Sequence, residues 1–594
     1  MRTLYFILLI FTLSYSTQAQ TVKKTTWFEE ARYGMFIHWG LYSAAEGLWK
    51  GENLRYLNNY AEWIQYRNRI GSQEYAKLAN RLVWEDINPE EWVIQAKKAG
   101  MKYIIMTSKH HDGVAIWDTK IGNYSINKLA GVNRDIIKEL ADACRKHNMK
   151  LGFYYSHWID WQHPYAWDHN QEIIGRVSDE QFDQYWQQKV IPQLTELLTN
   201  YGDIAIMWFD MWIPYEKTIF KREQLEQAVS LIRKLQPNCL INSRLGLPTD
   251  AKYVDFETLG DNTFSTTYIQ HPWETPGTIA HSWGYNGQEK EWKSTSQIFE
   301  SLIANVSLNG GLTLNIGPRA DGSIPLECQN RLNEVGEWLN KHSESIYGTT
   351  GLKFQLKQFD WGYLTAKGID SQNPKIYAQI FNWPLDNILR LTGIKNNPTK
   401  ITYKSSNGEL NLKFDKINEY TLHVILPKNP NNEIVYPIEI NYDGAIQTNR
   451  ELVSESTFGG YALHANNLIN STQLDIIPYD GKMPAHVITS KENIKWKVEL
   501  PLSAQDYKIS LSAHNPSRKD VKIEIKIGKS TVAGILKPDG KVVVEPNENN
   551  YTDEFTDRNL GIVHINEKGI LPVDFSVLGN EKILLNRIWI EELK

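Results

Sequence analysis

Two hydrophobic patterns alternate along the first 350 residues of the chain. Short runs in which almost every residue is apolar predict buried strands at 102–107, 149–156, 204–210, 239–243 and 311–316. Segments with apolar residues at helical spacing predict helices at 89–100, 134–148, 182–200, 224–235 and 296–308. Repeated strand–helix units predict a parallel sheet covered by helices. Their extent, about 320 residues, favours a (β/α)8-like TIM barrel over a doubly wound sheet.

The pattern changes near Gly351. Strand-like runs at 376–381, 410–414 and 420–426, separated by turn residues, predict an antiparallel β-sandwich. Similar runs at 496–500, 508–512, 521–527, 542–545 and 587–590 predict a further β-module. Tryptophan usage supports the first boundary, since 17 of the 21 tryptophans precede residue 350. We therefore expect a catalytic α/β domain at 21–350, a β-sandwich at 351–450 and a β-rich accessory module at 451–594.

The first 20 residues have the organisation of a secretory signal peptide. Arg2 supplies the basic end, Leu4–Leu13 is a mostly apolar run, and Thr17-Gln18-Ala19 is a small-residue cleavage site. The apolar run is too short to span a hydrocarbon layer of about 30 Å. We expect residues 1–20 to be removed and the protein to be soluble and exported, periplasmic or secreted, without membrane insertion.

Composition excludes several function classes. A net charge of −5 over 594 residues gives no strongly basic surface, so we expect no nucleic-acid partner. The three cysteines, Cys144, Cys239 and Cys328, lie far apart in the sequence. They can form neither a disulfide scaffold nor a metal-binding pair.

Polar and aromatic residues gather where the predicted strands end, which is where βα-barrels carry their reactive groups. They are His38, His110, His111, Tyr155, His157, Asp210 and Arg244. Asp210 closes an apolar run, and a carboxylate is costly there unless it is paired or used. Pairing with Arg244 would lower its pKa and keep it ionised, as a nucleophile requires.

Two other chemistries are less favoured. His110, His111, His157 and Asp160 offer metal-ligand atoms, but the H-E-x-x-H spacing is absent and adjacent histidines rarely bind one ion together. We expect neither a metal site nor a cofactor. The G-x-S-x-G motif of α/β-hydrolases is also absent.

A set of motifs runs through residues 22–350 in a fixed order. They are Trp27-Phe28, Gly34–Gly40, Ala61-Glu62-Trp63, Lys109–Gly113, Tyr154-Tyr155-Ser156, Trp208-Phe209-Asp210, Asn242-Ser243-Arg244, Trp273-Glu274, Ser282–Tyr285 and Asn309–Pro318. In these motifs the chain resembles the α-L-fucosidases of glycoside hydrolase family 29. That family has an imperfect (β/α)8 barrel followed by a β-sandwich, in agreement with the hydrophobic pattern. The module at 451–594 lies outside the resemblance.

The resemblance implies an exo-acting retaining enzyme that removes terminal α-linked L-fucose from an oligosaccharide or glycoconjugate. Asp210 would be the nucleophile of a double displacement. The residues implied to contact fucose are His38, Glu62, Trp63, His110, His111, Tyr155, Arg244 and Trp283. Both catalytic groups are side chains, so no cofactor is implied.

The acid/base is open among three carboxyl groups. Family members often carry Asp-aromatic-x-Thr-x-Glu after the arginine, and here Gly260 occupies the place of that glutamate. Asp261 follows it directly and stands 274 − 261 = 13 residues before Glu274, close to the family spacing of roughly a dozen. Glu257 is the second candidate and Glu274 the third.

Rival interpretations concern the sugar, catalysis itself and the last module. The substrate could be a related sugar such as α-L-galactose, because a pocket that only packs a methyl group discriminates weakly, by about 1–3 kcal/mol. A non-catalytic glycan-binding protein would explain Gly260. The module at 451–594 could be a stabilising spacer or could bind carbohydrate through Trp496 or Trp589.

Overall fold

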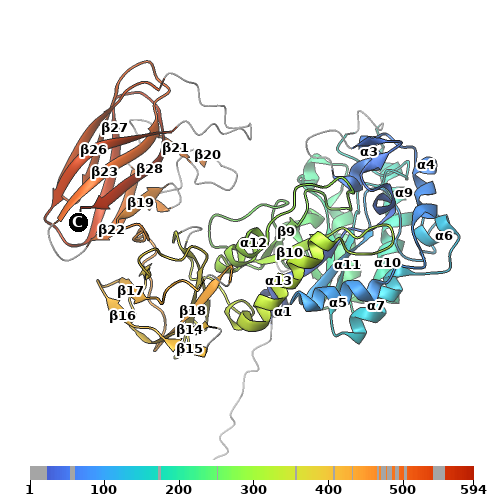
Figure 1. Cartoon of the computed structure of the whole chain (residues 1–594). Coiled ribbons are helices and arrows are strands. Elements are labelled where there is room, and N and C mark those ends of the chain that lie inside the picture. The colour runs from blue at the N-terminus through green and yellow to red at the C-terminus, as the bar shows by residue number, and fades with distance from the viewer. Residues whose placement is uncertain are drawn as a thin grey trace, which may run out of the picture.

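The computed structural model shows three bodies along the chain, a helix-covered barrel and two β-structures (Figure 1). It describes residues 23–53, 60–170, 176–249, 252–354, 358–405, 408–430, 433–464, 467–469, 476–477, 485–488, 494–500, 505–539 and 555–593. The predicted signal peptide at 1–20 and the predicted strand at 542–545 lie outside these residues.

The barrel is built from an eight-stranded parallel sheet of order β7-β6-β5-β4-β1-β10-β9-β8. Its strands are β1 (Tyr33–Ile37), β4 (Tyr103–Lys109), β5 (Lys150–Tyr155), β6 (Ile206–Phe209), β7 (Leu240–Ile241), β8 (Glu257–Thr258), β9 (Trp273–Thr278) and β10 (Gly311–Ile316). Two backbone hydrogen bonds join the edges β7 and β8, from Asp255 N to Ile241 O at 2.8 Å and from Ser243 N to Phe256 O at 2.9 Å. The sheet therefore closes on itself, which confirms the predicted (β/α)8-like fold.

Amphipathic helices cover this sheet. The longer ones are α5 (Pro89–Lys98), α7 (Ile136–Lys146), α9 (Asp179–Tyr185), α10 (Ile191–Asn200), α11 (Arg222–Leu235), α12 (Thr295–Ser307) and α13 (Leu326–His342). The shorter ones are α1 (Thr26–Ala31), α2 (Leu41–Ala45), α3 (Ile64–Arg67), α4 (Ser72–Ala76) and α6 (Ile126–Ala130). Helix α7 shows how the sequence sets a boundary, because the Asp135 side chain accepts from Lys138 N at 2.9 Å and caps the first turn. Ile136, Leu140 and Cys144 then face the core.

The barrel is irregular where β7, β8 and β9 follow one another. In the described part of the chain no α-helix separates these three strands. The hydrophobic pattern did not predict β8, which has only two residues, or β9, which contains Pro276 and Gly277. Both residue types are depleted in strands. The connections that would otherwise form helices instead carry Arg244 and Asp261 to the barrel mouth.

Two further β-structures follow, each with its own hydrophobic core. The first contains two sheets. One has the strand order β11 (Gly362–Lys367), β12 (Lys375–Ile380), β18 (Tyr436–Tyr442), β14 (Pro398–Ser405), β15 (Gly408–Asn411). The other has the order β13 (Ile388–Thr392), β17 (Thr421–Ile425), β16 (Phe414–Lys416). The second also contains two sheets. One has the strand order β20 (Ile476–Ile477), β21 (Ala485–Ile488), β28 (Ile583–Glu592), β23 (Gln505–His514), β26 (Thr556–Ile565), with β19 (Tyr461–His464) also paired to β28. The other has the order β22 (Ile494–Leu500), β27 (Gly569–Leu578), β24 (Val521–Ile527), β25 (Ser530–Leu536).

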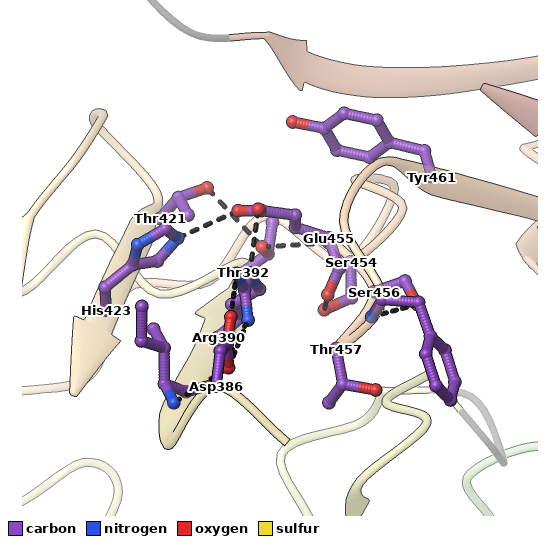
Figure 2. A network of polar contacts seen from close by, with 12 residues as sticks. Asp386, Arg390, Thr392, Thr421, His423, Ser454, Glu455, Ser456, Thr457 and Tyr461 are labelled. Atoms are coloured by element: carbon purple, nitrogen blue, oxygen red, sulfur yellow. Dashed lines mark hydrogen bonds and ion pairs between the residues drawn. The ribbon is translucent and has the colours of Figure 1, made fainter. Parts of the chain in front are cut away.

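A polar network joins these two β-structures (Figure 2). Arg390 on β13 bridges Asp386, at 2.7 Å, and Glu455, at 2.9 Å. His423 on β17 contacts the other oxygen of Glu455 at 2.8 Å. The Arg390 side chain is only 6% exposed, so this charge is largely withdrawn from water and held by its partners. The segment around Glu455 is thereby fixed to the sandwich.

Each of the three cysteines is a free, buried thiol. Burial raises the pKa of Cys144, Cys239 and Cys328 to about 12. Within the described residues, no helix has the length and apolar character needed to cross a membrane.

Candidate active site

A pocket of about 380 Å³ opens at the carboxyl ends of the barrel strands. It is lined by Phe36, His38, Tyr60, Glu62, Trp63, Arg67, His110, His111, Tyr154, Trp208, Asp210, Trp212, Arg244, Gly260, Asp261 and Trp283. The barrel thus gathers most of the predicted site residues from distant parts of the chain. The wall combines aromatic rings with a few charged groups, the usual make-up of a small-molecule site.

Asp210 lies just after β6 and receives polar contacts on both carboxylate oxygens. Tyr154 Oη donates to Oδ2 at 2.9 Å, and His111 Nε2 lies 3.5 Å from the same oxygen. Arg244 Nη1 contacts Oδ1 at 3.0 Å. Burial alone would raise the pKa of Asp210, but the hydrogen bond from His111 and the charge of Arg244 outweigh it and hold the pKa well below its usual range. The carboxylate is therefore ionised and available as a nucleophile.

Arg244 links Asp210 to a second carboxyl group. Its Nη2 atom lies 2.6 Å from Asp261 Oδ1, and the Asp261 side chain is 40% exposed at the pocket rim. Partial desolvation by the pocket wall raises the pKa of Asp261; the charge of Arg244 opposes this and the negative charge of Asp210 adds to it. One arginine thus bridges two aspartates whose pKa values move in opposite directions.

His38 is held in one tautomer by Asn315. The Asn315 amide nitrogen donates to Trp283 O at 2.7 Å, so its oxygen is the acceptor for His38 Nδ1 at 2.6 Å. Burial lowers the pKa of His38 to about 3, so the ring is neutral. Its Nε2 atom is then an acceptor, suited to a hydroxyl group in the pocket.

Glu62 fixes the loop that carries Trp283. Its Oε2 atom accepts from Gly284 N at 2.8 Å and from Ser282 Oγ at 3.4 Å. Burial raises the pKa of Glu62 to about 7 despite these hydrogen bonds. Trp283 is held 5.1 Å from the His38 ring, centroid to centroid, and is 5% exposed. Together they close one end of the pocket.

Two predicted site residues lie outside the pocket because side chains alternate along a strand. On β5, Tyr154 faces the pocket, whereas the hydroxyl of Tyr155 donates to Gln193 at 2.8 Å on the other side. On β8, Thr258 faces the barrel interior, whereas Glu257 contacts His271 at 2.6 Å. The structure therefore brings neither Tyr155 nor Glu257 to Asp210.

Glu274, the third acid/base candidate, lies inside the barrel below the pocket. It is 0% exposed and accepts from Trp208 Nε1 at 2.8 Å, with Thr313 and Tyr103 at its other oxygen. Burial raises the pKa of Glu274. Its contact with Trp208 is significant because Trp208 stacks on Tyr154, with ring centroids 5.4 Å apart. Glu274 thus supports the floor of the pocket.

Two of the four candidate metal ligands, Asp160 and His157, are engaged by other groups of the protein. Asp160 pairs with Lys109 and Lys189 at 3.3 and 2.7 Å, and His157 Nε2 contacts Leu245 O at 3.2 Å. No group of three or more His, Cys, Asp or Glu side chains in the described ranges could hold a metal ion.

Sequence reasoning did not single out several pocket residues. They are Phe36, Tyr60, Arg67, Tyr154 and Trp208. Strand alternation could have identified Trp208, because Trp208 and Asp210 are two residues apart and share a face. Trp212 follows β6 in a loop, where no periodicity reports which way a side chain points.

Two carboxyl groups facing an aromatic pocket on a (β/α)8-like barrel are the groups with which glycoside hydrolases act. The sequence profile of the family described as alpha-L-fucosidase matches residues 12–344. The chain belongs to this family and has alpha-L-fucosidase activity.

Individual relatives agree with this assignment. The tissue alpha-L-fucosidase of Rattus norvegicus is 27% identical over 423 residues, 70% of this chain and 87% of the relative. A GH29 alpha-L-fucosidase from Bacteroides thetaiotaomicron, solved as a trapped covalent intermediate with 2-fluoro-fucosyl fluoride, is 26% identical with a TM-score of 0.61 over 70% of this chain and 95% of its own. The alpha-L-fucosidase of Vibrio sp. strain EJY3 shares the fold, with a TM-score of 0.74 and 24% identity over 96% of this chain and 97% of its own.

Proposed function

We propose that this protein is an exo-acting retaining α-L-fucosidase that hydrolyses terminal α-linked L-fucose by double displacement. One observation carries the proposal: Arg244 bridges Asp210, whose pKa is lowered, and Asp261, whose pKa is raised. Divergent pKa values in a carboxyl pair distinguish an ionised nucleophile from a protonated acid. The covalent intermediate trapped in the Bacteroides thetaiotaomicron relative supports the same mechanism.

In the first step, a carboxylate oxygen of Asp210 attacks C1 of fucose and the bond from C1 to the glycosidic oxygen breaks. Asp261 gives its proton to the departing oxygen, which leaves as an alcohol. In the second step, Asp261 accepts a proton from water while the water oxygen attacks C1. The ester bond to Asp210 breaks and the carboxylate is restored, so two inversions give net retention.

The remaining pocket residues bind the sugar. Neutral His38 would accept a hydrogen bond from a sugar hydroxyl through Nε2, and Trp283 would pack against the apolar side of the ring and its methyl group. His110, His111, Glu62, Trp63 and Arg244 are the further proposed contacts. Tyr154 takes the place for which the sequence favoured Tyr155.

The test is hydrolysis of an aryl α-L-fucoside followed by NMR. We expect turnover, with the α-anomer of free fucose appearing before mutarotation. A first product with the β-configuration would contradict the retaining mechanism, and saturable binding without product would contradict catalysis. A higher kcat/KM on the matching α-L-galactoside would overturn the choice of sugar.

We also propose that residues 21–350 carry the chemistry and that the protein is exported after loss of residues 1–20. The support for export is the sequence pattern alone. The N-terminal sequence and mass of the protein recovered from its native host would test it, and a chain retaining Met1 would contradict it.

A further inference from the structure

Trp212 is an aromatic residue of the pocket wall that remains partly open to solvent. It is 44% exposed, whereas Trp283, which lines the same pocket, is 5% exposed. Ligand pockets are lined mainly by apolar and aromatic side chains, so an accessible indole ring in the wall is available to a ligand. The double displacement described above uses no atom of Trp212.

A row of rings connects the closed end of the pocket to Trp212. Successive centroid distances are 5.1 Å from Trp283 to His38, 5.6 Å from His38 to His110, 4.5 Å from His110 to His111, and 5.8 Å from His111 to Trp212. His111 also contacts Asp210 at 3.5 Å. His111 thus contacts both Trp212 and the proposed nucleophile, so a leaving group at the reacting carbon lies within reach of the indole ring.

The Trp212 ring is also held at a fixed place relative to the nucleophile. It packs edge-on against the buried Trp158, with ring centroids 4.8 Å apart, and Trp158 Nε1 donates to the backbone oxygen of Asp210 at 2.8 Å. On the other side, Met211 N donates to Arg244 O at 2.8 Å. A rigid aromatic face two residues from a nucleophile is a preorganised surface, and binding to it costs little ordering of the protein.

We propose that Trp212 forms a binding platform for the pyranose ring that carries the fucose, so that the enzyme recognises a fucose–sugar pair. This inference rests on the proposed function and extends it to the leaving group. The indole face would pack against the C–H face of that sugar, while the sugar's hydroxyl groups stay in water at the open rim. The platform binds the leaving group and takes no part in bond breaking.

The decisive experiment compares two substrates in Trp212→Ala and wild type. The first is α-L-fucosyl fluoride, whose leaving group has no ring, and the second is a disaccharide of α-L-fucose linked to galactose. We expect the variant to keep wild-type kcat/KM on the fluoride and to lose ~10-fold on the disaccharide, the size of effect that one aromatic contact gives. Trp212→Phe should retain most of the disaccharide activity. The matched control is Phe458→Ala, which removes an aromatic residue 75% exposed in the C-terminal region and should change neither.

A second measurement uses the fucosyl-enzyme itself. With the fluoride as donor, free galactose on the platform can replace water: its hydroxyl oxygen attacks C1, the bond to Asp210 breaks, and the proton passes to Asp261. Wild type should give more transfer product relative to free fucose than Trp212→Ala at equal galactose concentration. Equal partitioning in both proteins would contradict the platform.

The outcomes separate the two proposals. If wild type does not hydrolyse the fluoride, the proposed function fails and the platform fails with it. If wild type is active but Trp212→Ala loses both substrates equally, Trp212 supports the catalytic residues and the platform is wrong. If the variant loses neither, Trp212 contacts no leaving group.

Discussion

Among the described residues, two charge clusters each combine one arginine, one histidine and two carboxyl groups, one cluster at the barrel mouth and one between the two β-structures. In the first, Arg244 bridges Asp210 and Asp261 while His111 contacts Asp210. In the second, Arg390 bridges Glu455 and Asp386 while His423 contacts Glu455 (Figure 2). In both, hydrogen bonds and an arginine overcome the effect of burial and lower the pKa of the central carboxylate.

The difference lies in what each cluster faces. All four members of the barrel cluster line the pocket of about 380 Å³, in which aromatic rings can receive a ligand. A second cavity, of about 310 Å³, borders the other cluster, but of its four members only Glu455 is among the described lining residues. A lowered carboxylate pKa is therefore no sufficient sign of catalysis. The same groups hold two β-structures together when their polar atoms face one another instead of open space.

The strongest test of this contrast is Asp210→Asn. Loss of the proposed nucleophile should lower kcat/KM on an aryl fucoside by roughly 10⁴-fold or more, as removal of a catalytic nucleophile does elsewhere. Circular dichroism should show that the variant remains folded. Residual activity near that of wild type would mean that Asp210 is as structural as Glu455.

Asp261→Asn should have the next largest effect, and its size should depend on the leaving group. Loss of the acid should cost ~10²–10⁴-fold on a fucosyl disaccharide. It should cost much less in the first step with a nitrophenyl fucoside, whose leaving group needs no proton. Equal losses on both substrates would indicate that Asp261 only positions Arg244.

The direction in which activity changes with pH tests the same assignment of Asp261 and Asp210. Asp261 must be protonated in the first step, so its raised pKa extends activity on glycans toward neutral pH, and activity should fall as the pH rises through that value. Asp210 stays ionised far below its usual pKa, so it should not produce the acid limb. A kcat/KM profile on the disaccharide that rises with pH across the neutral range would contradict these assignments.

Glu455→Gln should have the smallest effect on catalysis and a measurable one on stability. We expect unchanged activity on the aryl fucoside and a loss of about 1.5–3 kcal/mol in the free energy of unfolding, the range for hydrogen bonds to charged groups. Because the folded pKa of Glu455 is lowered, its contribution is present above the unfolded value of about 4.3 and is lost as the pH falls through the folded value. Thermal unfolding of both proteins should therefore converge in acid; a constant difference would contradict the ionic role.

The parts of this structure that the sequence predicts are those that follow from periodicity. The apolar run at 311–316 coincides with β10, and the helix predicted at 224–235 forms most of α11. Short elements cannot be predicted in this way, because two residues such as Glu257-Thr258 show no detectable period. The sequence also did not distinguish Tyr154 from Tyr155, because a register error of one residue turns a side chain to the opposite face.

Which residue is the candidate acid/base depends on long-range geometry that the sequence does not give. The sequence left Asp261, Glu257 and Glu274 open because all three follow Arg244 within a short stretch. Only the path of the chain across β8 and β9 determines which carboxyl group reaches the pocket. Asp261 lines the pocket, whereas Glu257 contacts His271 and Glu274 is enclosed within the barrel.

The three buried cysteines make the native chain a convenient starting point for labelling. The thiolate is the form that attacks thiol reagents, and a pKa of about 12 leaves Cys144, Cys239 and Cys328 almost entirely protonated at neutral pH. A single cysteine introduced at an open position, such as Leu385 at 87% exposure, would then be the preferred site for a maleimide dye. The fluorescence of that dye would report changes around the β-sandwich without first removing any native cysteine.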